Sequence, residues 1–391
     1  MNFDLQRARQ DTPGCENVLH FNNAGASLMP LPVLKATIAH LQLEAQIGGY
    51  EAAERSHDAV ERVYDAAAAL IGCSRDEIAI IENATRAWDM AFYSIPFSPG
   101  DRILTAVAEY ASNYIAFLQI ARKTGATIEV IPNDDHGQIS VAALRNAVDE
   151  RVKLIAITHV PTNGGLVNPV AEVGKVAREA GVLYLVDACQ SVGQMPIDVN
   201  IVGCDMLSAT GRKFLRGPRG TGFLYVRRSV LERLEPPFLD LHAAEWVTRD
   251  HYEMLPNARR FENWETNYAG KIGLGVAIDY ALQWGLDTQW RRIKTLAYNL
   301  RARLSTLPGV IVRDRGVTQC GIVTFSVDGK DPEEIKRRLA DQHINVSVSV
   351  QSGTRLDMED RRLSSLVRAS VHYYNSEEEV ERFCAALASI I

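Results

Sequence analysis

The stretch "VKLIAITHVPTNGGLVNPVAEVGKVAREAGVLYLVDA" at residues 152–188 contains two nearly continuous apolar runs. The runs at 152–160 and 182–188 are typical of parallel strands that are covered on both faces of a sheet. Between them, residues 169–181 carry apolar side chains at helical spacing and end at a glycine, which predicts a crossover helix. The stretch therefore predicts a strand–helix–strand unit of an open α/β sheet.

The same alternation of strands and helices extends on both sides of this unit. Apolar and β-branched runs predict further strands at 77–83, 101–110, 127–132, 205–210 and 220–228. Helical spacing predicts helices at 31–46, 59–72, 84–95 and 113–125. We expect these elements to form a large, mostly parallel, doubly wound α/β domain.

The C-terminal part of the chain repeats the alternation on a smaller scale. Predicted helices at 290–306, 331–342 and 376–390 alternate with apolar strands at 309–314 and 320–327. The segment "INVSVSV" at 344–350 alternates strictly, which predicts one strand with a buried face and a solvent face. We expect a large domain over 20–285 and a small α+β domain over 286–391, on which residues 1–19 pack.

Composition narrows the classes of protein. The chain of 391 residues is 47% hydrophobic and carries a net charge of −6 without a basic stripe, which argues against a nucleic-acid partner. The N-terminal stretch lacks the apolar core of a signal peptide, and no uncharged apolar stretch is long enough to span a membrane. The six cysteines are scattered without a CxxC pair, so we expect no zinc or other metal, no disulfide framework and a cytoplasmic location.

Asp187 comes at the carboxyl end of the predicted strand 182–188. Ligands of open α/β sheets bind at that edge, where a carboxylate can pair with a protonated ring nitrogen. Gln190, three residues later, could reach the same ligand. The alternative is that Asp187 caps the following segment and Gln190 completes a turn.

Lys213 lies between Arg212 and Arg216 in the stretch "GRKFLRGPRG" at 211–220. Neighbouring cations favour the free amine, which makes a lysine nucleophilic, and they also suit a bound phosphate. The alternative is a solvated basic loop. The glycines at 217–222 precede a strand and not a helix, so a nucleotide-binding phosphate loop is not favoured.

The stretch "IENATRAWDMAF" at 81–92 passes from a strand into a helix. Backbone N–H groups of Ala84, Thr85 and Arg86 at the helix start could bind an anion such as phosphate. The alternative is that Asn83 or Thr85 only caps the helix.

Taken together, a phosphate site, a carboxylate at a strand end and an activated lysine resemble the pyridoxal-5′-phosphate (PLP) enzymes of the class V aminotransferase family, which includes cysteine desulfurases and selenocysteine lyase-like enzymes. The resemblance covers nearly the whole chain, through "FNNAGASLMP", "ENATRAWD", "AEYASNY", "HVPTNGG", "LVDACQSVG", "SATGRKFLRGPRGTG", "RRFENWETNYAG" and "LVRASVHYYNSEEEVERF" in the family's order. It implies the PLP-dependent transferase fold of type I, with a small C-terminal domain, and a homodimer.

The resemblance assigns roles to individual residues. Lys213 would bind the cofactor covalently, Asp187 would hold its ring nitrogen protonated, and Gln190 would lie near its phenolic oxygen. Tyr110 in "AEYAS" would stack on the ring where relatives carry histidine. The phosphate-site positions correspond to Thr85, Thr210 and Arg212.

Four further residues receive roles from the same comparison of motifs. Arg368 would bind the substrate carboxylate, with Asn23 beside it, since a guanidinium binds carboxylates bidentately. Asn163 would contact an oxygen of the cofactor or the substrate. Thr266, or a neighbour of it, would reach the phosphate in the partner subunit.

One departure from the family pattern bears on the reaction. Cysteine desulfurases carry a persulfide-forming cysteine on a mobile loop before the carboxylate-binding arginine, and residues 346–370 here contain none. The expected activity is therefore a C–S lyase that acts by β-elimination on cysteine or a derivative. Transamination and epimerisation stay open as alternatives, as does a non-catalytic dimeric binding protein. Cys189, next to the strand that ends at Asp187, is the one cysteine that could accept sulfur if the enzyme were instead a desulfurase.

Overall fold

A computed structural model describes residues 3–391 and contains a sheet of seven strands in the order β2-β8-β7-β6-β5-β3-β4. All neighbouring strands run parallel except β8, which is antiparallel to β7 and β2. The predicted mostly parallel α/β fold is thereby confirmed. The strands are β2 (Ile78–Ile81), β3 (Arg102–Ala106), β4 (Thr127–Ile131), β5 (Val152–Thr158), β6 (Leu183–Asp187), β7 (Met206–Thr210) and β8 (Gly222–Val226).

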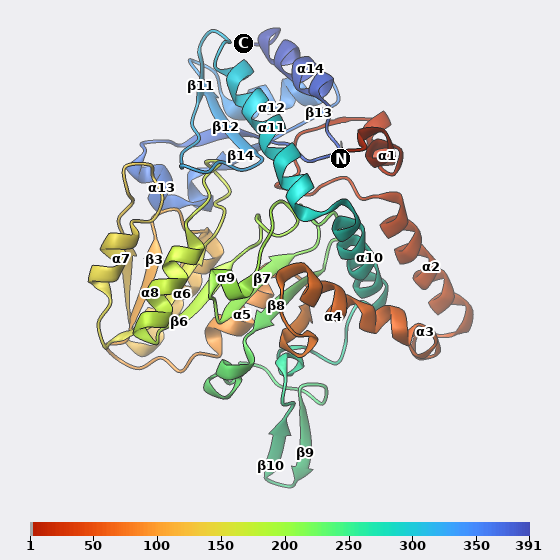
Figure 1. Cartoon of the computed structure of the whole chain (residues 1–391), viewed down its shortest axis with the longest axis vertical. Coiled ribbons are helices and arrows are strands. Elements are labelled where there is room, and N and C mark those ends of the chain that lie inside the picture. The colour runs from red at the N-terminus through yellow and green to blue at the C-terminus, as the bar shows by residue number, and fades with distance from the viewer. Residues whose placement is uncertain (1–2) are drawn as a thin grey trace.

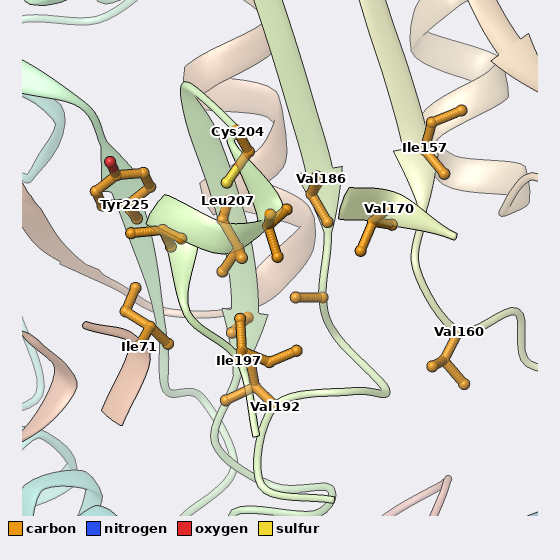
Figure 2. Close-up of a cluster of buried hydrophobic side chains, with 14 of the residues drawn as sticks. Ile71, Ile157, Val160, Val170, Val186, Val192, Ile197, Cys204, Leu207 and Tyr225 are labelled. Atoms are coloured by element: carbon orange, nitrogen blue, oxygen red, sulfur yellow. The ribbon is translucent and has the colours of Figure 1, made fainter. Parts of the chain in front are cut away.

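Helices cover both faces of this sheet (Figure 1). One face packs on α5 (Ala84–Tyr93) and α6 (Ala111–Thr124), which bury the aromatic side chains of Trp88, Phe92 and Phe117. The other face packs on α4 (His57–Ile71), α7 (Val141–Ala147), α8 (Val170–Ala180), α9 (Val199–Val202) and α10 (Tyr268–Trp284). Figure 2 shows how Val186, Leu207 and Tyr225 of adjacent strands meet in this second core.

A second sheet of four antiparallel strands forms in the C-terminal part, in the order β11-β12-β15-β14. These strands are β11 (Val310–Val312), β12 (Ile322–Val327), β14 (Ser347–Val350) and β15 (Ser365–Ser370). They share a core with α11 (Leu286–Leu304), α12 (Pro332–Ala340) and α14 (Glu377–Ala388). Gly285, with φ 74°, separates α10 from α11 at the predicted domain boundary.

The N-terminal segment packs on this small sheet. β1 (Leu19–His20) pairs in parallel with β13 (Ile344–Asn345), and Ala8 and Phe21 lie in the same core as β12 and β15. Residues 1 and 2 of the predicted segment 1–19 lie outside the described residues. The division into 20–285 and 286–391 with 1–19 stays a prediction.

Two features differ from the expectations or were not anticipated. The predicted single strand 344–350 is divided, because β13 pairs with β1 whereas β14 pairs with β15. A hairpin of β9 (Ala244–Thr248) and β10 (His251–Met254), for which the sequence analysis makes no prediction, projects from the large sheet at the bottom of Figure 1. The remaining helices are α1 (Leu5–Gln10), α2 (Leu31–Ile47), α3 (Gly49–Arg55) and α13 (Arg355–Asp360). Within residues 3–391, the structure contains no helix with the length and apolar character needed to cross a bilayer.

Candidate active site

A cavity of about 270 Å³ opens where three parallel strands end. β5, β6 and β7 end at Thr158, Asp187 and Thr210, and all three residues line the cavity. Ligands of open α/β sheets bind at this edge. We call it the Lys213 cavity; its lining residues are Asn83, Ala84, Thr85, Tyr110, Thr158, Val160, Thr162, Asp187, Cys189, Gln190, Thr210, Arg212 and Lys213.

Asp187 is buried at the end of β6 and forms no salt bridge within residues 3–391. Its Oδ1 accepts a hydrogen bond from the backbone N–H of Cys189 at 2.9 Å, and its Oδ2 accepts one from the side-chain amide of Asn113 at 3.0 Å. A carboxylate has about four acceptor sites, so these two bonds leave capacity for another donor. Asp187 can therefore accept an N–H from a cationic ligand in the cavity.

The loop that carries Lys213 is anchored by the residues after the lysine. The backbone N–H of Tyr373 donates to Nδ1 of His372 at 2.8 Å, so Nε2 carries the ring proton and donates to the Phe214 carbonyl at 3.0 Å. Burial lowers the pKa of His372 well below its usual value, which keeps the ring neutral. The lysine side chain has no part in this anchoring.

Arg216 fixes the same loop to the two ends of the chain. Its buried guanidinium donates to Thr12 Oγ1 at 2.5 Å, to Tyr373 OH at 2.8 Å and to the Leu28 carbonyl at 2.9 Å. It also lies 4.4 Å from the ring centre of Tyr374, a cation–π distance. The loop backbone is thus held while the amino group of Lys213 remains available in the cavity.

The thiol of Cys189 lies beside Lys213 in the cavity. Burial raises the pKa of this thiol, and the charge and hydrogen bond of Lys213 oppose the effect only in part. The net shift is upward, so the thiol is protonated at neutral pH and is a poor nucleophile.

The start of α5 forms the opposite end of the cavity. Asn83 caps the helix, with its Oδ1 accepting from the backbone N–H of Arg86 at 3.0 Å. The N–H groups of Ala84 and Thr85 point from the first helical positions and can still bind an anion. The backbone N–H of Arg86, which the sequence analysis assigned to the cofactor, is already used by the cap.

The side chain of Arg86 also lies elsewhere, in a second cavity of about 610 Å³ that we call the Trp264 cavity. It pairs with Glu82 at 3.4 Å and covers the ring of Phe238 at 5.3 Å. The prediction that Arg86 binds the cofactor is therefore not supported by its position. Thr266 lines the Trp264 cavity as well, and its contact with a partner subunit's cofactor stays a prediction.

Arg368 approaches the Lys213 cavity from β15 of the small sheet. It is only 9% exposed, yet it forms no salt bridge within residues 3–391, and its Nε has no hydrogen-bond partner there. Its Nη1 donates to Thr162 Oγ1, and its Nη2 lies 3.5 Å from Asn22 Oδ1. Burial and the nearby Arg212 lower the pKa of Arg368 to about 10. A buried cation without a counter-ion is costly, which indicates a site for an anion such as a carboxylate.

Two predicted ligand-binding asparagines point away from the cavity. The Asn163 amide donates to Asp357 Oδ2 at 2.8 Å, and Thr162, one residue earlier, lines the cavity in its place. The Asn23 amide donates to the Ser370 carbonyl at 2.7 Å and its Oδ1 accepts from Tyr374 OH, so it joins the two parts of the chain. The predicted roles of Asn163 and Asn23 are corrected accordingly, because both residues lie in turns and long-range hydrogen bonds hold their side chains within the protein.

Gln190 carries an unused acceptor. Its Nε2 donates to the Ala24 carbonyl at 3.1 Å, but its Oε1 is buried without a hydrogen-bond partner. Buried polar atoms in folded proteins nearly always have partners, so the orphaned oxygen indicates a ligand group. Thr210, by contrast, lines the cavity while its hydroxyl donates to the Thr221 carbonyl at 3.3 Å.

A family model of the aminotransferases class V matches residues 19–383. The chain belongs to the class V aminotransferase family. The relatives that it resembles include the "probable cysteine desulfurase" of Methanothermobacter thermautotrophicus, which is 30% identical over 98% of this chain and 97% of that protein.

Solved structures of this family agree with the fold. The apo structure of a cysteine desulfurase from Thermococcus onnurineus has a TM-score of 0.91 at 29% identity, covering 100% of this chain and 98% of that one. The cystine C–S lyase C-DES, in complex with its product cysteine persulfide, has a TM-score of 0.87 at 25% identity, covering 96% and 99%. C-DES has also been solved with glycine covalently linked to its PLP cofactor.

Class V aminotransferases use PLP, and this chain is a PLP-dependent enzyme. The described residues fit the cofactor. Lys213 brings an amino group, Asp187 has no cationic partner among the described residues, and Gln190 has a buried oxygen without a hydrogen-bond partner, all in one cavity. Tyr110, 38% exposed, presents an aromatic ring to the same space.

The sequence did not predict four residues of this region: Thr162, Asn22, Glu109 and Asn113. The amide of Asn113 donates to both Glu109 and Asp187. The signals were present for Glu109 and Asn113, since both belong to the motif "AEYASNY". Thr162 and Asn22 adjoin the predicted site residues Asn163 and Asn23. Their side-chain directions depend on loop geometry, which no periodic pattern reveals.

Proposed function

We propose that this enzyme is a C–S lyase that cleaves cysteine or a cysteine derivative by β-elimination. Support comes from relatives named as cysteine desulfurases and from C-DES, named as a cystine C–S lyase. Arg368 offers a cation for the carboxylate of an α-amino acid beside Thr162 of the cavity, and Lys213 offers the amino group that binds the cofactor.

The positions of the chain's own residues support the following roles. PLP, when bound, supplies the electron sink that stabilises a carbanion at Cα of the substrate. Lys213 binds the cofactor and then takes the Cα proton as a general base. Asp187 holds the proton on the ring nitrogen, and Arg368 binds the substrate carboxylate. The sulfur then leaves from Cβ as sulfide from cysteine, as a thiol from an S-substituted cysteine or as a persulfide from cystine, and hydrolysis of the remaining fragment gives pyruvate and ammonia.

The segment between β14 and β15 carries the proposal, because it contains no cysteine and is bonded to the loop after β5. Asp357 of α13 is buried and accepts from Asn163 at 2.8 Å and from Arg361 at 3.0 Å. The hydrogen bond from Asn163 ties α13 to the loop after β5, and the ion pair with Arg361 holds the Asp357 carboxylate. By resemblance, desulfurases need a mobile cysteine here to take up sulfur; a fixed segment without cysteine favours release of the sulfur as a small molecule.

The first test follows the sulfur. After incubation with cysteine and trapping with an alkylating reagent, we expect the intact mass to show no added sulfur while sulfide and pyruvate form in equal amounts. Cys189→Ala should retain turnover. A persulfide on one cysteine, formed at the rate of turnover, would instead establish a desulfurase.

Arg368 provides a second test. We expect Arg368→Lys to raise KM for the amino acid by about 10- to 100-fold and to change kcat less, because the bidentate grip on the carboxylate is lost while the charge remains. Arg303→Lys, at an exposed pair with Glu381, is the matched control. An unchanged KM in the Arg368 variant would remove Arg368 from the substrate site.

A desulfurase is the second candidate function, with Cys189 as sulfur acceptor. The position of the thiol beside Lys213 favours it, and the raised pKa of the thiol opposes it. The family also contains aminotransferases, and an epimerase or a non-catalytic binding protein would retain the same fold. Assays for alanine, for amino transfer to a keto acid and for loss of chirality at Cα separate these from the lyase.

We also propose a homodimer in the cytoplasm. Leu34, Ile38 and Leu41 form an exposed apolar face of α2 at helical spacing, as expected of an interface. The six free cysteines suit a reducing compartment. Sedimentation of the holoenzyme, compared with a Leu41→Glu variant, tests the dimer.

A further inference from the structure

A second buried carboxylate lies directly behind Asp187. Glu109 is 4% exposed and has no salt bridge within residues 3–391. The side-chain nitrogen of Asn113 donates both to Glu109 Oε1 at 2.9 Å and to Asp187 Oδ2 at 3.0 Å. One amide therefore bridges the two carboxylates and fixes them relative to each other.

Glu109 also holds the residues around the cavity. Its Oε1 accepts from the backbone N–H of Tyr110 at 2.7 Å and from Thr158 Oγ1, and its Oε2 accepts from Thr105 Oγ1 at 3.0 Å. Tyr110 and Thr158 both line the Lys213 cavity. Glu109 thus holds the backbone of Tyr110 and the carboxyl end of β5, and it is the same carboxylate that Asn113 bridges to Asp187.

The negative charge of Glu109 is not needed for this packing. Its obligate donors, the Tyr110 N–H and the Asn113 amide, bond one oxygen, and the threonine hydroxyls can accept as well as donate. A glutamine could satisfy the same groups, whereas a carboxylate in this place carries the cost of burying a charge. A carboxyl group kept at this buried position next to Asp187, where an amide would serve the packing, points to a role in the site.

We propose that Glu109 is a positioning residue of the PLP site, which orients Asp187 through Asn113 and adds a second negative charge behind the ring nitrogen. This inference rests on the proposed role of Asp187. Because Asn113 joins the two carboxylates, Glu109 can hold Asp187 in its orientation and can add its own charge to that of Asp187 near the ring nitrogen.

The electrostatics agree with this coupling. Burial raises the pKa of Glu109 to about 7, its hydrogen bonds oppose the rise, and the nearby charge of Asp187 adds to it. A cationic ring at Asp187 would favour ionised Glu109, and ionised Glu109 would favour the cationic ring.

The experiment compares Glu109→Gln, Asp187→Asn and the control Glu379→Gln, reconstituted with PLP that carries 15N in its ring, by following the NMR shift of the ring nitrogen against pH. Glu379 is also a buried carboxylate, but it pairs with Arg9 in the small domain. We expect Glu109→Gln to lower the midpoint of the ring-nitrogen titration by about one pH unit, since loss of a nearby negative charge disfavours the protonated ring nitrogen. Asp187→Asn should lower it further, and Glu379→Gln should leave it unchanged.

The outcomes distinguish the proposed role of Glu109 from the assigned role of Asp187. A midpoint that moves in Asp187→Asn but not in Glu109→Gln overturns the role of Glu109 and leaves the proposed function standing. Midpoints that move in neither variant overturn the assigned role of Asp187 as well.

A second measurement covers the case in which Glu109→Gln does not fold. In the cofactor-free enzyme, infrared titration should show a buried carboxyl group that titrates near pH 7. Asp187→Asn should lower that midpoint, because a like charge has been removed. An unchanged midpoint would overturn the coupling.

Discussion

Replacing Lys213 with alanine is expected to reduce turnover of cysteine by at least about 1,000-fold, because the variant lacks both the covalent attachment of PLP and the general base. The protein should still fold, since the loop is held by the bond from His372 to the Phe214 carbonyl and by Arg216. Formation of pyruvate and sulfide measures the loss. The absorption spectrum should show PLP that is bound without a link to the protein.

Two controls isolate the role of the amine. Lys213→Arg keeps the charge but cannot attach the cofactor, so it should be as inactive as the alanine variant. Lys175→Ala, at an exposed lysine that faces Glu172 on α8, should have normal activity. Substantial turnover by the Lys213→Ala enzyme would remove this residue from the mechanism.

Asp187→Asn is expected to slow abstraction of the Cα proton by at least about 100-fold, because an amide cannot balance the positive charge of a protonated ring nitrogen. The wild-type carboxylate accepts from Cys189 N–H and from the Asn113 amide on its two oxygens. An asparagine can accept on one oxygen only, so one of these donors also loses its partner. Exchange of the Cα hydrogen for deuterium, followed by mass spectrometry, reports the rate of this step.

Asp205→Asn is the matched control for that variant. Asp205 is a carboxylate at the opposite end of β6, where it accepts from the backbone N–H of Tyr184 at 3.0 Å. Its substitution can affect stability but not the ring nitrogen. Near-normal exchange in Asp187→Asn would refute the electrostatic role of Asp187.

The apolar runs at β5 and β6 and the amphipathic helix between them were sufficient to predict the large sheet, because burial on both faces leaves a local signature in the sequence. The hairpin of β9 and β10 left no such signature. Its residues, among them Trp246, are largely exposed, and exposed strands lack the pattern that burial imposes. The split of residues 344–350 depends on β1, which is distant in the chain.

The sequence by itself determined the class of enzyme and the residues whose chemistry is local. Lys213, Asp187 and Gln190 stand in motifs whose spacing follows from strand ends and loops, and the structure places them in one cavity. Tertiary structure alone decided which neighbour faces that cavity. It places Thr162, and not Asn163, in the cavity lining, it places Asn22, and not Asn23, next to Arg368, and it places Glu109 behind Asp187. These choices depend on long-range hydrogen bonds between the two parts of the chain, such as that from Asn23 to the Ser370 carbonyl, and no local pattern specifies them.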